Sequence, residues 1–94
     1  GVDQIACISV NDTFVMEAWG EAHGVIGSIT MVGDGDANFA QATGLVVDLP
    51  SAGLGHRSQR YAMVINEGVV EELLLEENGL SVANSTAECV LDRL

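Results

Sequence analysis

Residues 55–77 read GHRSQRYAMVINEGVVEELLLEE, and this stretch carries the clearest structural signal of the chain. Two apolar segments, Tyr61–Ile65 and Val69–Leu75, have the length and the β-branched and aromatic side chains that are typical of strands. Asn66–Gly68 separates them, and its glycine can take the positive φ that a tight turn requires. The stretch therefore predicts an antiparallel β-hairpin.

Outward from the hairpin, segments of helical and of strand character alternate. In chain order the predicted elements before it are a strand at Ile5–Val10, a helix at Thr13–His23, a strand at Ser28–Val32, a short helix at Ala37–Thr43, extended chain at 45–50 and a loop at Ser51–Gln59. Asn11 and Asp12 are both suited to cap the first of these helices, and Asp36 the second. After the hairpin, Ser85 and Glu88 form a capping box, which predicts a final helix. This order predicts one α/β domain over residues 1–94, a sandwich with a mixed sheet and flanking helices.

The composition limits the class of protein. The 94 residues are 48% hydrophobic, which is enough to build a core and argues against intrinsic disorder. A formal net charge of −11 argues against nucleic acid and anionic membranes as partners, because both bind basic surfaces. No apolar run approaches the roughly 18–20 residues of a transmembrane helix. The two cysteines are too few for a disulfide scaffold, so we expect a reducing, cytoplasmic environment.

Two segments imitate ligand-binding loops without completing the pattern. Asp34–Asn38 (DGDAN) begins like a calcium loop, but Phe39 and Leu45 stand where that loop needs glycine and glutamate. Residues 53–58 (GLGHRS) contain the glycines of a phosphate loop, but they do not lie in a β-α-β unit and the chain has no lysine. We interpret the first segment as a capped turn and the second as a loop.

The histidines and cysteines do not predict a metal site. His23, His56, Cys7 and Cys89 are scattered, without the short spacings that zinc ligands have. Cys7 lies within a predicted strand, where we expect a buried and inert thiol. Cys89 lies in the last predicted helix, where packing is favoured over a redox role. We expect neither a metal ion nor a cofactor.

The positive charges are more informative, because the chain has only three basic residues, all of them arginines. Arg93 is expected to complement the dipole of the last helix, and Arg57 to be a solvated charge. Arg60 directly precedes the first strand of the hairpin, so the strand fixes its backbone at the end of the sheet, where sites of α/β proteins gather. A guanidinium there suits an anion or a thiolate, or a structural ion pair with one of the many carboxylates.

Several separated motifs resemble a known family. Residues 1–24 (GVDQIACISVNDTFVMEAWGEAHG), residues 55–77 and the STAE sequence at 85–88 resemble a peroxiredoxin in order and spacing. The subfamily is the type-five, or atypical two-cysteine, thiol peroxidases, some of which carry a fused glutaredoxin. The resemblance covers the whole chain and corresponds to the C-terminal two-thirds of a peroxiredoxin. It implies a thioredoxin-like (redoxin) fold, an α/β mixed sheet with flanking helices that is incomplete at the N-terminus.

The resemblance also implies a function. Peroxiredoxins reduce hydrogen peroxide and small alkyl hydroperoxides with a cysteine thiolate, and an external thiol such as glutathione, glutaredoxin or thioredoxin restores them. The family's catalytic arginine matches Arg60, which would stabilise the thiolate and orient the peroxide. Arg57 would lie near the mouth of the same site. A homodimer is implied as well, with interface candidates Asn11, Asp12, Phe14, Met16 and Leu54.

Two features depart from the family pattern. The peroxidatic cysteine of the family lies in a Pro-x-x-x-Thr-x-x-Cys motif, which is absent here, and neither Cys7 nor Cys89 matches it. We therefore expect a fragment that is inactive alone and that lacks a central strand between Ile5–Val10 and Tyr61–Ile65. Val82 or a neighbour stands where some members have a resolving cysteine, so an outside thiol is favoured as reductant.

Two other interpretations stay open. In the first, the chain is a catalytically inactive redoxin domain that serves dimerisation or partner binding. In the second, it is an acidic α/β domain whose arginines are only structural. A Pro-x-x-x-Thr-x-x-Cys segment in the upstream sequence would favour the peroxidase over both.

Overall fold

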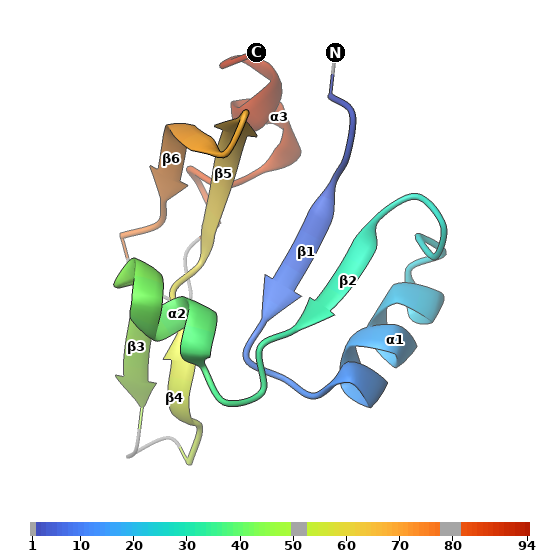
Figure 1. Ribbon diagram of the computed structural model, residues 1–94, viewed down its shortest axis with the longest axis vertical. Coiled ribbons are helices and arrows are strands. Elements are labelled where there is room, and N and C mark those ends of the chain that lie inside the picture. Colours follow the sequence, from blue (N-terminus) through green and yellow to red (C-terminus); the bar gives the residue numbers. More distant parts are fainter. Residues whose placement is uncertain (1, 50–52, 78–81) are drawn as a thin grey trace. The chain divides into compact units, whose positions relative to one another are not determined.

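The computed structural model describes residues 2–49, 53–77 and 82–94, and it divides into two compact units, Gly1–Ser58 and Gln59–Leu94 (Figure 1). The described strands form three two-stranded sheets. One sheet is parallel and two are antiparallel, which confirms the predicted mixture of strand directions.

The first unit begins with a β-α-β arrangement. Its elements are β1 (Ala6–Ser9), α1 (Thr13–Ala22), β2 (Thr30–Gly33), α2 (Asn38–Thr43), β3 (Val46–Leu49) and β4 (Gly55–Ser58). β1 pairs with β2 in parallel, and Figure 1 shows α1 beside β2. Of the two residues predicted to cap α1, Asp12 is the cap, because its side chain accepts a hydrogen bond from the Val15 N–H at 2.8 Å.

The buried face of α1 is not formed by its aromatic residues. Phe14 and Trp19 are 80% and 49% exposed, whereas Met16 and Gly20 are buried. A Cβ atom on Gly20 would lie 3.0 Å from the Met31 side chain of β2, so the missing side chain allows the close approach of helix and strand. The helix thus turns a methionine and a glycine inward and leaves its rings outside.

A small apolar core lies around α2, and it is formed by Val10, Ala37 and Ala40 with Val46 packed against them. Asp34 caps this helix, since its carboxylate accepts hydrogen bonds from the N–H groups of Phe39 and Ala40, both at 3.0 Å. The prediction that Asp36 is the cap was therefore wrong. The helix ends at Thr43, and Gly44 follows with φ of 75°, as the sequence predicted.

The stretch predicted as a loop at Ser51–Gln59 contains a strand. Residues 50–52 lie outside the described part of the chain, but Gly55–Ser58 forms β4 and pairs antiparallel with β3. The polar residues of β4 do not have the side chains typical of a strand. The segment is extended because its backbone pairs with β3.

The second unit contains the predicted hairpin. β5 (Tyr61–Asn66) and β6 (Val69–Leu75) are antiparallel, and Tyr61 pairs with Leu75 at the open end. Glu67 and Gly68 have φ of 52° and 80°, the signature of a type I′ turn, which confirms the predicted role of the glycine. Val64 pairs with Glu72 and Ile65 with Val70, so Glu71 is an extra, bulged residue of β6.

The last helix, α3 (Ala87–Leu91), begins one residue later than predicted. Thr86 is its N-cap and accepts a hydrogen bond from the Cys89 N–H at 3.2 Å, so the predicted capping box of Ser85 and Glu88 was wrong. The Ser85 hydroxyl instead donates to the Glu76 carboxylate. The Ser85 hydroxyl is bound by a carboxylate just after β6, a partner that helix signals in the sequence do not reveal.

The two strands expected to flank a central strand have one partner each. Among the described strands, β1 pairs only with β2 and β5 only with β6. No described strand pairs with both β1 and β5, as the expected central strand would. Each of the two therefore has one edge with no described strand partner.

Candidate functional site

Arg60 directly precedes β5, as predicted, and its backbone is held by the hairpin. Its carbonyl oxygen accepts a hydrogen bond from the Glu76 N–H at 3.0 Å, one step beyond the pair Tyr61–Leu75. Its side chain is exposed, and no ion pair between described residues includes it. The catalytic role of Arg60 stays a prediction.

Glu76 occupies the centre of a dense hydrogen-bond network beside Arg60. Although it is only 4% exposed, its carboxylate accepts from the backbone N–H groups of Ala83, Asn84 and Ser85 and from the Ser85 hydroxyl. The shortest distances are 2.6 Å from the hydroxyl and 2.7 Å from the Ser85 N–H. Burial raises the pKa of this carboxyl, but the hydrogen bonds from Ser85, Ala83 and Asn84 outweigh it and lower the pKa from 4.5 to about 2.

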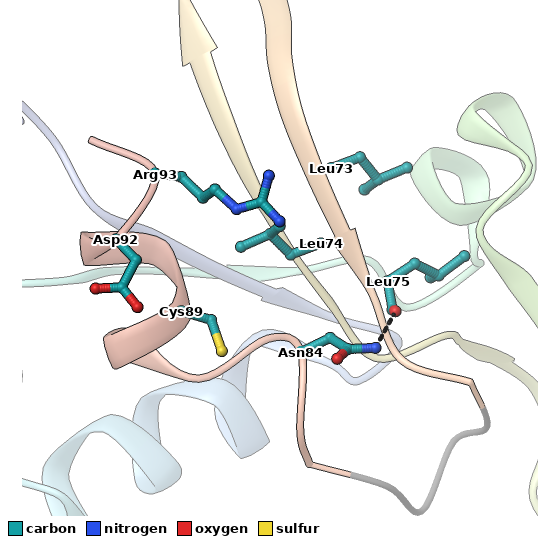
Figure 2. Close-up of a pocket in the computed structure, with 7 residues that line it drawn as sticks. All are labelled: Leu73, Leu74, Leu75, Asn84, Cys89, Asp92 and Arg93. Atoms are coloured by element: carbon teal, nitrogen blue, oxygen red, sulfur yellow. Dashed lines mark hydrogen bonds between the residues drawn. The ribbon is translucent and has the colours of Figure 1, made fainter.

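The same loop leads to a shallow hollow that contains Cys89 (Figure 2). The hollow has a volume of about 350 Å³ and is lined by Leu73, Leu74, Leu75, Asn84, Cys89, Asp92 and Arg93. The Cys89 thiol is half-buried and donates to the Ala83 carbonyl at 3.2 Å, and the Asn84 amide donates to the Leu75 carbonyl at 3.1 Å. Packing, the favoured role for Cys89, agrees with these contacts, and a redox role remains a prediction.

Arg93 lies beyond the last helical residue, Leu91, and outside the final turn of α3. Its guanidinium is 3.6 Å from the Glu72 carboxylate of β6. The expectation that it complements the helix dipole was therefore wrong, because the nearest compensating charge is on the hairpin. Both side chains are largely solvated, so the pair contributes little to stability.

Arg57 is bound to the backbone of the first unit and is not a freely solvated charge, contrary to the prediction. Its guanidinium donates to the carbonyl oxygens of Leu54 and Val10, at 2.7 and 3.1 Å, and to the Asn11 side chain at 3.3 Å. The side chain is half-buried. It connects β4 to the chain that leaves β1, and its predicted place at the mouth of a site remains untested.

The predicted interface residues differ in exposure. Phe14 and Leu54 are 80% and 46% exposed, and Asp12 is exposed but engaged in capping α1. Asn11 is half-buried beside Arg57. Met16 is only 3% exposed and presents almost no surface to a second chain, because it lies on the buried face of α1.

The remaining candidate ligands are separate. Cys7 is a free thiol in β1, and partial burial raises its pKa, as an unreactive thiol requires. The ring centroids of His23 and Trp19 are 4.3 Å apart, with the rings tilted by 45°, and His56 Nδ1 lies 3.8 Å from the Asp48 carboxylate. Within the described residues, no three His, Cys, Asp or Glu side chains gather as metal ligands would. None of the described helices is long and apolar enough to cross a membrane.

Glu76 is the functional candidate that sequence reasoning missed. A signal was present, because residues two apart on a strand share a face and Leu74, two residues earlier, is buried. In the segment EELLLEE (residues 71–77), this pattern places Glu76 at the next inward position. A glutamate is rarely buried there unless a partner binds its carboxylate. The partner itself, a loop seven to nine residues further on, could not be found from spacing.

Comparisons with known proteins assign the chain to a family. The Redoxin family matches residues 1–91. Peroxiredoxin-2E of Arabidopsis thaliana chloroplasts is 47% identical over the whole chain, and the hybrid peroxiredoxin hyPrx5 of Haemophilus influenzae is 44% identical over 83% of it. The crystal structure of reduced Prx3 from Vibrio vulnificus in complex with H2O2 matches the whole chain with a TM-score of 0.89 and 53% identity.

The chain belongs to the redoxin family and has the thioredoxin-like fold predicted for it. Within that family it is a peroxiredoxin of the type-five kind, which confirms the resemblance drawn from its motifs. The chain spans 41% of the length of the Arabidopsis relative, 32% of the Haemophilus relative and 60% of the Vibrio chain.

Proposed function

We propose that the whole protein is a thiol-dependent peroxidase that reduces hydrogen peroxide and small alkyl hydroperoxides. One observation carries this proposal: all 94 residues match, at 53% identity, a peroxiredoxin whose structure is described in its reduced form with H2O2. The similarity to Peroxiredoxin-2E and to a hybrid peroxiredoxin supports the same chemistry.

In the proposed reaction, a cysteine outside residues 1–94 supplies the nucleophile. Its thiolate attacks the distal peroxide oxygen, an S–O bond forms, and the O–O bond breaks to leave a sulfenic acid and an alkoxide or hydroxide that takes up a proton. Arg60 stabilises the thiolate and the negative charge that develops on the leaving oxygen. Its place at the first residue before β5 supports this role, because the hairpin fixes its backbone.

The test is peroxide consumption by the full-length protein with variants of its arginines. Arg60→Ala is expected to lower kcat/KM for hydrogen peroxide by about 10²–10³-fold, as loss of one oxyanion donor does. Arg60→Lys is expected to recover little, because an ammonium group lacks the planar fork of donors. Arg93→Ala is the matched control, since the described contact of its guanidinium is a largely solvated ion pair with Glu72. Wild-type activity in Arg60→Ala would remove Arg60 from the site, and no activity in the wild type would overturn the function.

The reductant is proposed to be an external thiol, glutathione with glutaredoxin or thioredoxin. Val82 stands where a resolving cysteine occurs in some members, and the Cys89 thiol is bound to the Ala83 carbonyl. Turnover with each purified reductant, measured side by side, identifies which is used. A Cys89→Ser variant that loses turnover with every reductant would show instead that the resolving thiol is internal.

A second candidate is a redoxin domain that acts through association, and the exposed apolar side chain of Phe14 favours an interface at the exposed surface of α1. Leu54 is exposed as well and is a separate interface candidate. We propose a homodimer through the exposed surface of α1 in either case. Sedimentation of full-length Phe14→Glu is expected to give a monomer, whereas Glu17→Gln on the same helix leaves the dimer intact. A dimer that persists in Phe14→Glu would exclude this surface.

We further propose a cytoplasmic location. The free thiols of Cys7 and Cys89 support a reducing compartment. The Arabidopsis relative, however, is described as chloroplastic. Fractionation of cells that express the full-length protein tests the location directly.

A further inference from the structure

We propose that Glu76 is a positioning residue for Arg60: its side chain anchors the loop at residues 83–85 while its own backbone holds the Arg60 carbonyl. The proposal rests on the proposed peroxidase function. It adds the residue that holds the backbone of Arg60, from which the catalytic guanidinium extends. It uses contacts within the second unit alone.

The anchor is a ring of donors around one carboxylate. Three successive backbone N–H groups, of Ala83, Asn84 and Ser85, lie 2.9, 2.9 and 2.7 Å from the nearer Glu76 oxygen. The Ser85 hydroxyl adds a fourth donor at 2.6 Å. Successive N–H groups that converge in this way form an anion-binding nest, here filled by a side chain of the same unit.

The nest requires a carboxylate and not merely a polar side chain. Backbone N–H groups can only donate, and three of the four donors are of this kind. A glutamine would place its NH2 group against at least one of them, so two donors would face each other. The amide isostere is therefore expected to fail here, whereas it would succeed at a solvated position.

The backbone of Glu76 makes the contact that links this loop to Arg60. The Glu76 N–H donates to the Arg60 carbonyl at 3.0 Å and so extends the β5–β6 ladder by one bond beyond Tyr61 and Leu75. The neighbouring Leu75 carbonyl accepts from the Asn84 amide at 3.1 Å (Figure 2). Together with the Glu76 carboxylate, this bond attaches the loop to the strand end at two points. A loose loop would allow the end of β6, and with it Arg60, to fray.

Arg60 depends on this support more than a paired arginine would. Its side chain is exposed and forms no ion pair with a described carboxylate, so its backbone bond to Glu76 is the described contact that places it. A displacement of about 1 Å at a catalytic group can cost on the order of 10²-fold in rate. Fixing the strand end is therefore an effective way to hold a catalytic guanidinium.

A double-mutant cycle in the full-length protein tests the proposal. Glu76→Ala is expected to lower kcat/KM for hydrogen peroxide by about 10- to 100-fold in the wild-type background and by less than about 2-fold in the Arg60→Ala background. Glu76→Gln is expected to behave like Glu76→Ala, and Glu77→Ala, at the exposed neighbouring position, to behave like the wild type. A residue that only stabilised the fold would give equal losses in both backgrounds.

Three results would overturn the proposal. They are unchanged kcat/KM in Glu76→Ala, equal losses with and without Arg60, and full activity in Glu76→Gln. If Glu76→Ala does not fold, Ser85→Ala is used instead, because it removes only one of the four donors. Its smaller loss of kcat/KM must also disappear in the Arg60→Ala background. An inactive wild type overturns the proposed function and the positioning role with it, whereas an active wild type with an additive cycle overturns the positioning role alone.

Discussion

Glu76 shows at the level of one side chain how hydrogen bonds can reverse the effect of burial. An almost fully buried carboxyl is ordinarily driven toward its neutral form, but this one meets donors from Ala83, Asn84 and Ser85. Its pKa falls from 4.5 to about 2, so it remains charged over the physiological range. The charge is part of the structure and not an incidental feature of an acidic chain.

The pH dependence of stability follows from this shift. Because the pKa of Glu76 is lower in the folded state, its stabilising contribution is complete above about pH 4.5 and is lost as the pH falls toward 2. Full-length Glu76→Gln is expected to be less stable than wild type in urea unfolding at pH 7. The difference should shrink between pH 4.5 and 2, because a protonated glutamate also brings a donor to the nest. A difference that stays constant down to pH 2, or appears equally in Glu77→Gln, would contradict the assignment.

Arg57 makes a separate prediction at the same scale. Arg57→Ala leaves the carbonyl oxygens of Val10 and Leu54 without this donor and is expected to destabilise the full-length protein by about 1–2 kcal/mol. Arg57→Lys should recover only part of this, because one ammonium group cannot reproduce the spread of donors. Arg93→Lys, at a solvated ion pair, is the control and should change stability by less than about 0.5 kcal/mol in urea unfolding.

At the level of elements, the sequence predicted what local patterns decide. The hairpin of β5 and β6, the helix α1 with its Asp12 cap and the glycine after α2 were all confirmed. Each depends on residues close together in the chain, such as a turn glycine or a cap three residues from its donor. The errors arose where a distant partner decides: β4 is a strand because β3 pairs with it.

The two cap errors have the same cause. Asp34 and not Asp36 caps α2, because the intervening turn brings the earlier carboxylate over the helix start. Ser85 leaves the start of α3 to Thr86, because Glu76 binds its hydroxyl. The Glu76 network itself was beyond prediction, since β6 and the loop meet only in the folded unit. For the candidate site, the sequence therefore supplied Arg60 and the family but not the residue that supports the arginine.

The competing caps of α2 can be separated by mutation. Asp34→Ala is expected to destabilise the full-length protein by about 1–2 kcal/mol, because two N–H groups at the helix start lose their acceptor. Asp36→Ala, two residues away and without such a bond among the described contacts, should change stability by less than about 0.5 kcal/mol. Chemical denaturation of both variants measures the difference, and equal effects would show that the two carboxylates share the role.

At the level of the whole molecule, the 94 residues bury few large side chains. The buried apolar residues of the described chain are Val10, Met16, Ala37, Ala40, Leu45 and Leu74. Many large apolar side chains remain exposed, among them Phe14, Val69 and Leu91 at 80%, 64% and 67%. Extensive exposed apolar surface is characteristic of proteins that bind a further chain or segment there.

This exposure predicts the behaviour of residues 1–94 expressed alone. We expect the isolated chain to bind a hydrophobic dye and to self-associate at micromolar concentration. Because residues 1–94 lack the Pro-x-x-x-Thr-x-x-Cys motif, we also expect no peroxidase turnover with dithiothreitol or glutathione. The full-length protein is expected to bind far less dye. Dye fluorescence, sedimentation and a peroxide assay measure these properties. A monomeric isolated chain without dye binding would contradict the expectation, and so would cysteine-dependent turnover.

The bulged residue of β6 has a consequence for how this hairpin can change its length. Counted from the turn without an interruption, Leu75 and not Glu76 would stand opposite Arg60, and the carboxylate would miss its loop. The bulge takes one residue out of the ladder, so Val69 stays opposite Asn66 at the turn and Glu76 stays bonded to Arg60 at the other end; the residue taken out is Glu71. Deleting it would leave both alignments in place, whereas an added residue elsewhere in β6 would have nowhere to be absorbed. Tolerance of insertions should thus be sharply asymmetric along a strand only seven residues long.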